Sequence, residues 1–72
     1  MRDIEITTEL ITLGQLLKLA GELETGGDAR TQLTAGGFSV NGEDEARRGR
    51  KLVPGDVVAL PGGDALRVVP AS

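Results

Sequence analysis

The chain opens with a regular alternation of polar and apolar residues. Over residues 2–7, Ile4 and Ile6 fall on one side and charged residues on the other, with the period of two that is typical of a half-buried strand. The spacing then changes, because the apolar positions of residues 13–20 recur every three or four residues. This second pattern predicts an amphipathic helix.

Both ends of the predicted helix carry further signals. Thr12 and Gln15 have the spacing of a capping box, in which each side chain accepts a hydrogen bond from the other residue's backbone amide. Ile11 and Leu16 stand at the two positions of a hydrophobic staple. Gly21 is expected to end the helix, because glycine readily adopts the left-handed conformation that follows many helices.

A second helix is predicted over residues 27–35. Thr25 and Asp28 repeat the spacing of a capping pair, and Leu33 is expected to face inward. The Gly36-Gly37 pair should end this helix. The sequence therefore predicts two helices, one directly after the other along the chain.

Turn signals separated by short apolar runs dominate the rest of the chain. Asn41-Gly42 predicts a hairpin, because both turn positions need positive φ. Pro54-Gly55 fits a type II turn before the apolar run 57–60, and residues 61–64 form another turn before the run 66–69. These patterns predict one α+β domain over residues 1–72, with two helices packed on a small, mainly antiparallel sheet that has an N-terminal strand and a C-terminal hairpin.

Composition narrows the possible chemistry. The 72 residues include neither cysteine nor histidine. Most nucleophilic triads, zinc sites and neutral-pH proton shuttles require at least one of these two residue types. The adjacent carboxylates Glu43, Asp44 and Glu45 lie in a turn region without histidine support. We therefore expect no enzyme activity, no catalytic residue, no metal site and no cofactor.

The amino terminus has no continuous apolar stretch of signal-peptide or membrane-spanning length. We therefore expect a cytoplasmic protein with no membrane partner.

Half of the eight Lys and Arg residues fall within five positions of the chain. We call residues 47–51 the cationic segment; its charged residues are Arg47, Arg48, Arg50 and Lys51. The segment lies between two turn signals, so we expect its charges to be exposed on a rigid surface. A concentrated cationic edge indicates a polyanionic partner, even though the net charge is −3, because charges more than about 8 Å apart across water are largely screened.

Phe38 is the single aromatic residue of the chain, and we expect it in the core. Proteins that bind unpaired bases usually stack them on several aromatic side chains. Any RNA binding by this chain should therefore depend on phosphates, sugars and shape. If each charge of the cationic segment neutralises one phosphate, log affinity should fall with log salt with a slope of roughly −3 to −4.

Four stretches of the chain, in order, resemble one known family. They are residues 16–21 (Leu-Leu-Lys-Leu-Ala-Gly), 25–30 (Thr-Gly-Gly-Asp-Ala-Arg), 38–42 (Phe-Ser-Val-Asn-Gly) and 47–56 (Arg-Arg-Gly-Arg-Lys-Leu-Val-Pro-Gly-Asp). Together they are similar to the RNA-binding domain named after small-subunit ribosomal protein four, also called the alpha-L motif, and above all to its small stand-alone bacterial members. The resemblance covers about residues 13–60, with the first strand and the last hairpin as peripheral additions.

This resemblance implies a helix-loop-helix on a small sheet that binds structured RNA, such as ribosomal RNA, without catalysis. A ribosome-associated protein is a further partner that this setting implies. The candidate phosphate contacts are the basic residues that match the family's positions, with Lys18 the weakest of them: Lys18, Arg30, Arg47, Arg48, Arg50 and Lys51.

Gly26 and Gly27 are candidates of another kind. They precede the second predicted helix, and the start of a helix exposes backbone N–H groups with a partial positive charge. Glycines at this position would let a phosphate approach those groups, although a tight turn is their ordinary role.

Three other interpretations stay open. The cationic segment could be a solvated loop that pairs with the neighbouring carboxylates, or it could bind a protein and make the chain an adaptor. The opening strand and helix, together with residues 40–42 and 54–58, also look like a β-grasp sulfur carrier. Such carriers need a free carboxyl-terminal Gly-Gly, whereas this chain ends in Pro70-Ala71-Ser72 and has Gly62-Gly63 in a predicted turn.

Overall fold

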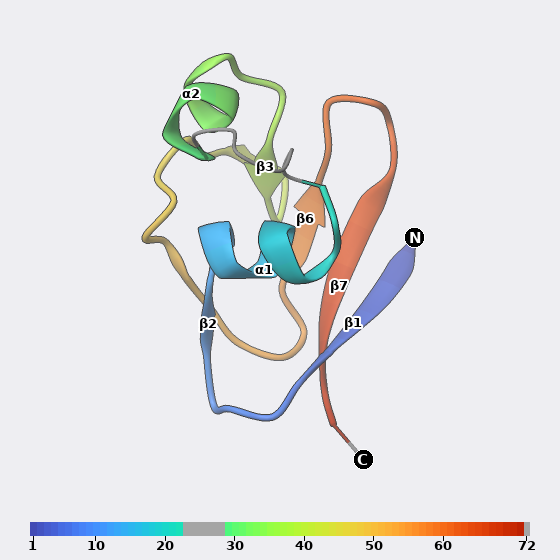
Figure 1. Ribbon diagram of the computed structural model, residues 1–72. Coiled ribbons are helices and arrows are strands. Elements are labelled where there is room, and N and C mark those ends of the chain that lie inside the picture. Colours follow the sequence, from blue (N-terminus) through green and yellow to red (C-terminus); the bar gives the residue numbers. More distant parts are fainter. Residues whose placement is uncertain (23–28, 72) are drawn as a thin grey trace.

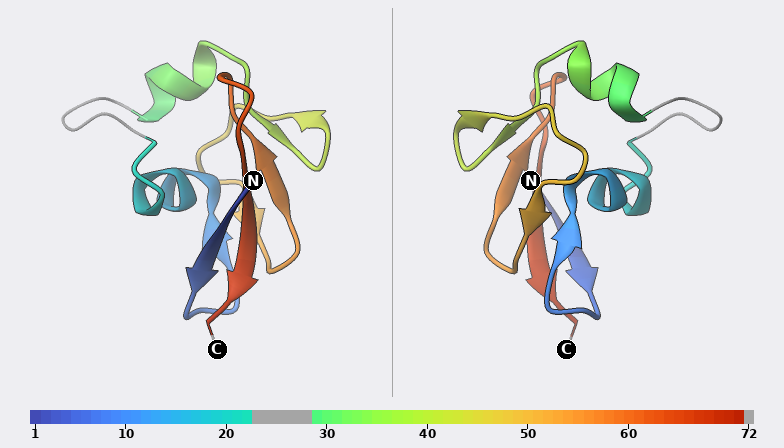
Figure 2. Two further views of the ribbon diagram at one scale, coloured as in Figure 1. Left: turned by 90° about the vertical axis from the view of Figure 1, so that its right-hand side faces the viewer. Right: turned by 90° about the vertical axis from the view of Figure 1, so that its left-hand side faces the viewer.

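Two short helices lie on the same side of a twisted sheet (Figures 1 and 2). The computed structural model describes residues 1–22 and 29–71, with side chains for all of these except residues 29 and 30. The elements, in chain order, are β1 (Arg2–Ile6), β2 (Ile11–Thr12), α1 (Leu13–Leu19), α2 (Ala29–Thr34), β3 (Ser39–Val40), β4 (Glu43–Asp44), β5 (Lys51–Leu52), β6 (Val57–Ala59) and β7 (Ala65–Pro70). The predicted α+β class is confirmed.

The strands form a larger and a smaller sheet. The larger sheet has the order β1-β7-β6-β3-β4, and β2 pairs with β5 in the smaller one. All pairs are antiparallel except β1 with β7, in which Arg2 lies opposite Leu66 and Ile6 opposite Pro70. The prediction of a mainly antiparallel sheet is confirmed, and the parallel pair joins the first strand to the last.

Helix α1 has the predicted signals at both ends. The Thr12 hydroxyl accepts from the Gln15 amide and the Gln15 side chain accepts from the Thr12 amide, each at 3.3 Å, which completes the capping box. At the other end, the amides of Gly21 and Glu22 donate to the carbonyls of Lys18 and Leu17, as in a Schellman motif. Local sequence signals therefore define both boundaries of α1.

Helix α2 is present where the second helix was predicted; its described part is Ala29–Thr34, it ends one residue before the predicted end at 35, and residues 27 and 28 lie outside the described residues. Leu33 is fully buried, as expected. The predicted capping pair Thr25 and Asp28 lies outside the described residues.

The predicted turns also form. Asn41 and Gly42 have φ values of 52° and 87°, which the tight β3–β4 hairpin requires. The amide of Asp56 donates to the carbonyl of Val53 at 3.0 Å and closes the turn at Pro54-Gly55. Gly62 and Gly63 lie in the turn between β6 and β7, so this glycine pair is part of a hairpin and not a free chain end.

One hydrophobic cluster holds the two layers together. Leu13, Leu16 and Leu17 of α1 are fully buried against residues from the strands, and Phe38 is 6% exposed within the same cluster. The prediction that the single aromatic side chain belongs to the core is therefore confirmed. The first turns of α1 are anchored by this core, and the cationic segment is attached at that end of the helix.

Candidate nucleic-acid interface

The cationic segment is bonded to the start of α1 through its backbone. The amides of Leu13 and Gly14 donate to the carbonyls of Arg50 and Arg48, at 2.8 and 2.9 Å. At its end the segment enters β5, which pairs with β2 (Figure 2), and Lys51 lies opposite Thr12 in this pair. Because residues 48, 50 and 51 are bonded to elements with buried residues, the side chains of the segment extend from a rigid base.

Gly14 permits this close approach. A Cβ atom at position 14 would lie 3.3 Å from the Cβ atom of Arg48 and 3.4 Å from its carbonyl oxygen, which is tighter than an ordinary contact. The absence of a side chain therefore lets the cationic segment lie directly on the first turn of α1.

Glu45 organises two of the four cations. Its Oε2 accepts from Arg47 Nε at 3.1 Å, and its Oε1 accepts from Arg47 Nη2 at 3.1 Å and from Arg50 Nη1 at 2.9 Å. Oε2 also accepts from the amides of Ala46 and Arg47, at 3.2 and 3.3 Å. The Glu45 side chain is only 8% exposed, so one shielded carboxylate lies between two guanidinium groups.

These hydrogen bonds change the acidity of Glu45. The donors of Arg47, followed by those of Arg50, lower the pKa of this carboxyl to about 2, against the opposing effect of burial. The same contact with Glu45 raises the pKa of Arg47. The trio therefore stays ionised at every physiological pH.

The four cations of the segment thus fall into two pairs. The side chains of Arg47 and Arg50 both bind Glu45, whereas those of Arg48 and Lys51 have no hydrogen bond or ion pair within the described part of the chain. The prediction that all four are exposed is wrong for Arg50, whose side chain is 34% exposed because it reaches inward to Glu45.

One interpretation of the cationic segment was a loop whose cations pair with the neighbouring carboxylates Glu43, Asp44 and Glu45. Only Glu45 forms such pairs within the described part of the chain. Glu43 and Asp44 form the edge strand β4, are exposed, and make no side-chain hydrogen bond or ion pair with any described residue. Three adjacent carboxylates look equivalent in the sequence. The sequence therefore gave no means to select Glu45 as the one that turns toward the arginines.

Lys18 is a further unpaired cation, on the helix that the cationic segment contacts. It is exposed, without a side-chain partner among the described residues, and stands four positions after Gly14, on which Arg48 rests. Four residues of an α-helix span about 6 Å along the axis, and positions i and i+4 share one face. Lys18, Arg48 and Lys51 therefore lie around the first two turns of α1.

An open groove of about 410 Å³ lies beside Lys18. It is lined by Ile11, Gln15, Lys18 and Leu19, and the Leu19 side chain is 59% exposed. The groove is mainly apolar apart from the ends of Gln15 and Lys18. The groove therefore places an apolar surface next to the positive charge of Lys18.

The remaining predicted contacts are less defined. Arg30 belongs to the first turn of α2, where its side chain is not described, and Gly26 and Gly27 lie outside the described residues. The phosphate roles of these three residues stay predictions. At α1, by contrast, the amides of Leu13 and Gly14 already bond to carbonyl groups, so cationic side chains are the groups presented there.

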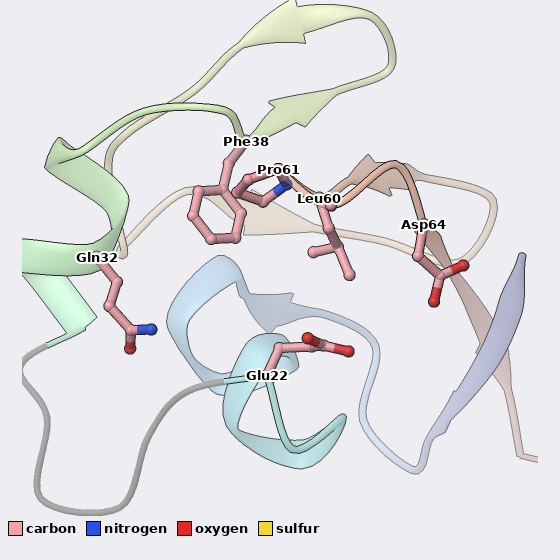
Figure 3. A pocket seen from close by; sticks show the side chains of 7 residues that line it. Glu22, Gln32, Phe38, Leu60, Pro61 and Asp64 are labelled. Carbon is pink, nitrogen blue, oxygen red and sulfur yellow. The ribbon is translucent and has the colours of Figure 1, made fainter.

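A second pocket, of about 300 Å³, has a different character (Figure 3). Phe38, Leu60 and Pro61 line its apolar part, and the carboxylates of Glu22 and Asp64 also face it. Arg2 forms ion pairs with both carboxylates, including a contact of 3.3 Å from its Nε to Asp64. Because its charged groups are carboxylates and its nearby cation is already paired, this pocket is unsuited to a phosphate.

Residues 1–22 and 29–71 contain no group of three His, Cys, Asp or Glu residues that could hold a metal ion. Neither helix of this part of the chain has the length and apolar character needed to cross a bilayer.

Comparison with known proteins agrees with the architecture. The family model of the S4 domain matches residues 4–69, a longer stretch than the resemblance over residues 13–60, so β1 and β7 belong to the shared domain. A probable ribosome maturation protein, RlbA of Bacillus subtilis (strain 168), is 50% identical over 66 residues, which cover 92% of this chain and 93% of the relative. The chain belongs to the S4 domain family.

Proposed function

We propose that this chain is a non-catalytic protein of the cytoplasm that binds structured RNA through its cationic segment in association with the ribosome. Three observations support the proposal. The chain is an S4 domain, its relative in Bacillus subtilis is named as a probable ribosome maturation protein, and unpaired cations lie around α1. The observation that carries it is structural. Arg48 and Lys51 at the start of α1, and Lys18 in its last turn, have no anionic side chain bound to them in the described part of the chain.

The mode of binding follows from the residues at this surface. Arg and Lys side chains neutralise phosphates and release counterions, which makes affinity strongly dependent on salt. Arg30 would extend the RNA-binding surface along α2. Arg47 and Arg50 shape the loop that carries Arg48 and Lys51. Because the one aromatic ring is buried, bases are not stacked, and discrimination between RNAs comes from the spacing of phosphates in a folded target.

The negative net charge sets the expected strength of binding. With a net charge of −3, attraction between the whole molecule and a distant RNA is weak, and only the local patch attracts phosphates. Non-specific dissociation constants should therefore be no tighter than about 10⁻⁶ M. A structured target whose phosphates match the patch should bind more tightly.

A second candidate function is that of an adaptor that binds another protein. The observation in its favour is the apolar groove beside Lys18, together with the exposed side chain of Leu19. Such a groove fits an apolar side chain of a protein partner as readily as it fits part of an RNA. The two functions predict different partners in cells.

The test is to crosslink the protein in cells, to sequence the RNA it captures, and to repeat the capture after ribonuclease treatment. We expect enrichment of a few structured regions, with ribosomal RNA prominent, and loss of co-purifying ribosomal components after ribonuclease. Recovery of background RNA alone, with partner proteins that survive ribonuclease, would reject RNA binding in favour of the adaptor.

A further inference from the structure

We infer that Glu45 determines the specificity of the cationic segment by withholding Arg47 and Arg50 from RNA, which leaves Arg48 and Lys51 as its phosphate-binding pair. The inference rests on the proposed RNA-binding function and divides four similar charges into two roles. The division follows from which side chains the carboxylate holds.

The contacts of Glu45 are numerous for a single carboxylate on a small domain. Five N–H groups converge on it, two from the backbone of Ala46 and Arg47 and three from the guanidinium groups of Arg47 and Arg50. The amide of Glu45 is itself bonded to the carbonyl of Phe38 at 3.1 Å, next to the core. The carboxylate is therefore fixed in position before any ligand arrives.

Exchanging Glu45 for a phosphate would cost either arginine the hydrogen bonds it already makes. The Glu45 side chain is 8% exposed, so an arginine that left it would leave a shielded carboxylate short of donors. Arg47 is 76% and Arg50 34% exposed, so losing these ion pairs costs far less than losing a buried pair, but the charge-assisted hydrogen bonds given up still offset part of the new contact with phosphate. Arg48 and Lys51 break no ion pair when they bind a phosphate. The cost of their binding is therefore only the conformational entropy lost when their own side chains become ordered.

Restricting the number of mobile cations has a consequence for specificity. Freely moving arginines can reach phosphates of almost any RNA, and each added contact strengthens non-specific binding. A pair of cations on a rigid base, by contrast, binds well only where two phosphates are suitably placed. Glu45 therefore lowers the affinity for unrelated RNA more than the affinity for the matching target.

The first experiment compares two single variants in salt titrations with purified ribosomal RNA. Arg48→Gln should reduce the magnitude of the slope of log affinity against log salt by roughly 0.7 to 0.9, the value for one phosphate contact. Arg47→Gln should leave the slope nearly unchanged, although both variants lose one positive charge. Equal flattening by the two variants would overturn the inference.

The second experiment releases the arginines with Glu45→Gln and uses polyuridylate as an unstructured probe. We expect the slope to steepen by up to roughly 1.4 to 1.8, for one or two added phosphates. Extrapolated from about 1 M to about 0.15 M salt, the same contacts tighten polyuridylate binding roughly 4- to 30-fold. The ratio of affinities for ribosomal RNA and polyuridylate should fall.

Glu43→Gln is the matched control. It removes the same negative charge two residues away from Glu45, and the Glu43 side chain binds no described residue. It should change neither the slope nor the ratio. An unchanged slope in Glu45→Gln, or an equal change in Glu43→Gln, would overturn the inference. If Glu45→Gln does not fold, the comparison of Arg47→Gln with Arg48→Gln decides alone.

Failure of this inference is distinguishable from failure of the proposed function. If Arg47→Gln and Arg48→Gln weaken RNA binding equally, the protein binds RNA but Glu45 withholds nothing. If the wild-type protein binds neither RNA in a salt-dependent way, the proposed function itself fails, and the inference fails with it.

Discussion

The two ends of α1 carry charged groups in opposite arrangements. At the start of the helix, the segment bonded to Leu13 and Gly14 contains two cations without partners, Arg48 and Lys51. At its end, the amide of Glu22 bonds to Leu17, and the Glu22 carboxylate pairs with Arg2. Apart from Lys18, whose side chain in the last turn has no partner among the described residues, a helix of seven residues thus separates a region with unpaired cations from one in which carboxylates match the cations.

Pairing continues on the side of the molecule formed by β1 and β7. Arg67 binds Asp3 through two hydrogen bonds of 3.0 Å, and Asp64 pairs with Arg2 and, at 3.9 Å, with the amino terminus. With Glu22 included, these three cations have three carboxylate partners, so that side offers little to a phosphate. The comparison shows that local pairing, more than the net charge of −3, decides where this protein can bind a polyanion.

Loosening α1 should have the largest effect, because both regions are attached to it. Leu17 is fully buried in the shared core, so Leu17→Ala should lower the free energy of unfolding by ~2–5 kcal/mol. Denaturant unfolding measures this loss. An unchanged midpoint would contradict the packing described for α1.

Leu19→Ala is the control for the helix itself. It makes the same chemical change two residues further on, at a side chain that is 59% exposed. Its effect should be within about 0.5 kcal/mol, since surface substitutions seldom exceed this value.

A pair of double variants should separate the two regions by function. Replacing Arg48 and Lys51 by Gln should weaken RNA binding roughly 14- to 30-fold at about 0.15 M salt and flatten the salt slope by roughly 1.4 to 1.8. Replacing Arg2 and Arg67 by Gln removes the same charge from the matched region and should leave the slope unchanged. Fluorescence titrations at several salt concentrations provide both values.

Equal losses in the two double variants would show that RNA responds to total charge, and the contrast between the regions would then have no bearing on binding. The ion pairs of Arg2 and Arg67 are exposed, and such pairs contribute about 0–1 kcal/mol each. Both double variants should therefore stay folded, which circular dichroism can verify.

A smaller effect than the loss of RNA binding should appear in the pH dependence of stability. Because the pKa of Glu45 is lowered to about 2 in the folded protein, its ion pairs stabilise the fold fully above the ordinary carboxyl pKa of about 4.3. This contribution declines as the pH falls from about 5 toward 2. The wild-type protein should therefore lose more stability over this range than Glu45→Gln does.

Thermal unfolding at a series of pH values tests the effect. At neutral pH the wild-type protein should be the more stable of the two, and the difference should shrink toward pH 2. Glu43→Gln should track the wild-type curve, because its carboxylate holds no described side chain. Parallel curves for wild type and Glu45→Gln would show that the trio does not stabilise the fold.

The sequence by itself determined the local structure of this protein. The capping box, the Schellman end of α1 and the Asn41-Gly42 hairpin each depend on groups within five residues of one another, so their signals are complete within a short window. The burial of the leucine stripe and of Phe38 follows from their apolar character. The position of the cationic segment between two turns was also visible in the sequence.

Only the tertiary structure decided which charges stay available. The parallel pairing of β1 with β7 brings Arg67 to Asp3 across 64 positions of the chain, and no local pattern specifies such a partner. The partners of Glu45, Arg47 and Arg50, are near in sequence, but only the folded loop turns this carboxylate toward them and leaves its neighbours in solvent. Electrostatic partners depend on distances between atoms in space, and those distances exist only once the helices and strands have packed.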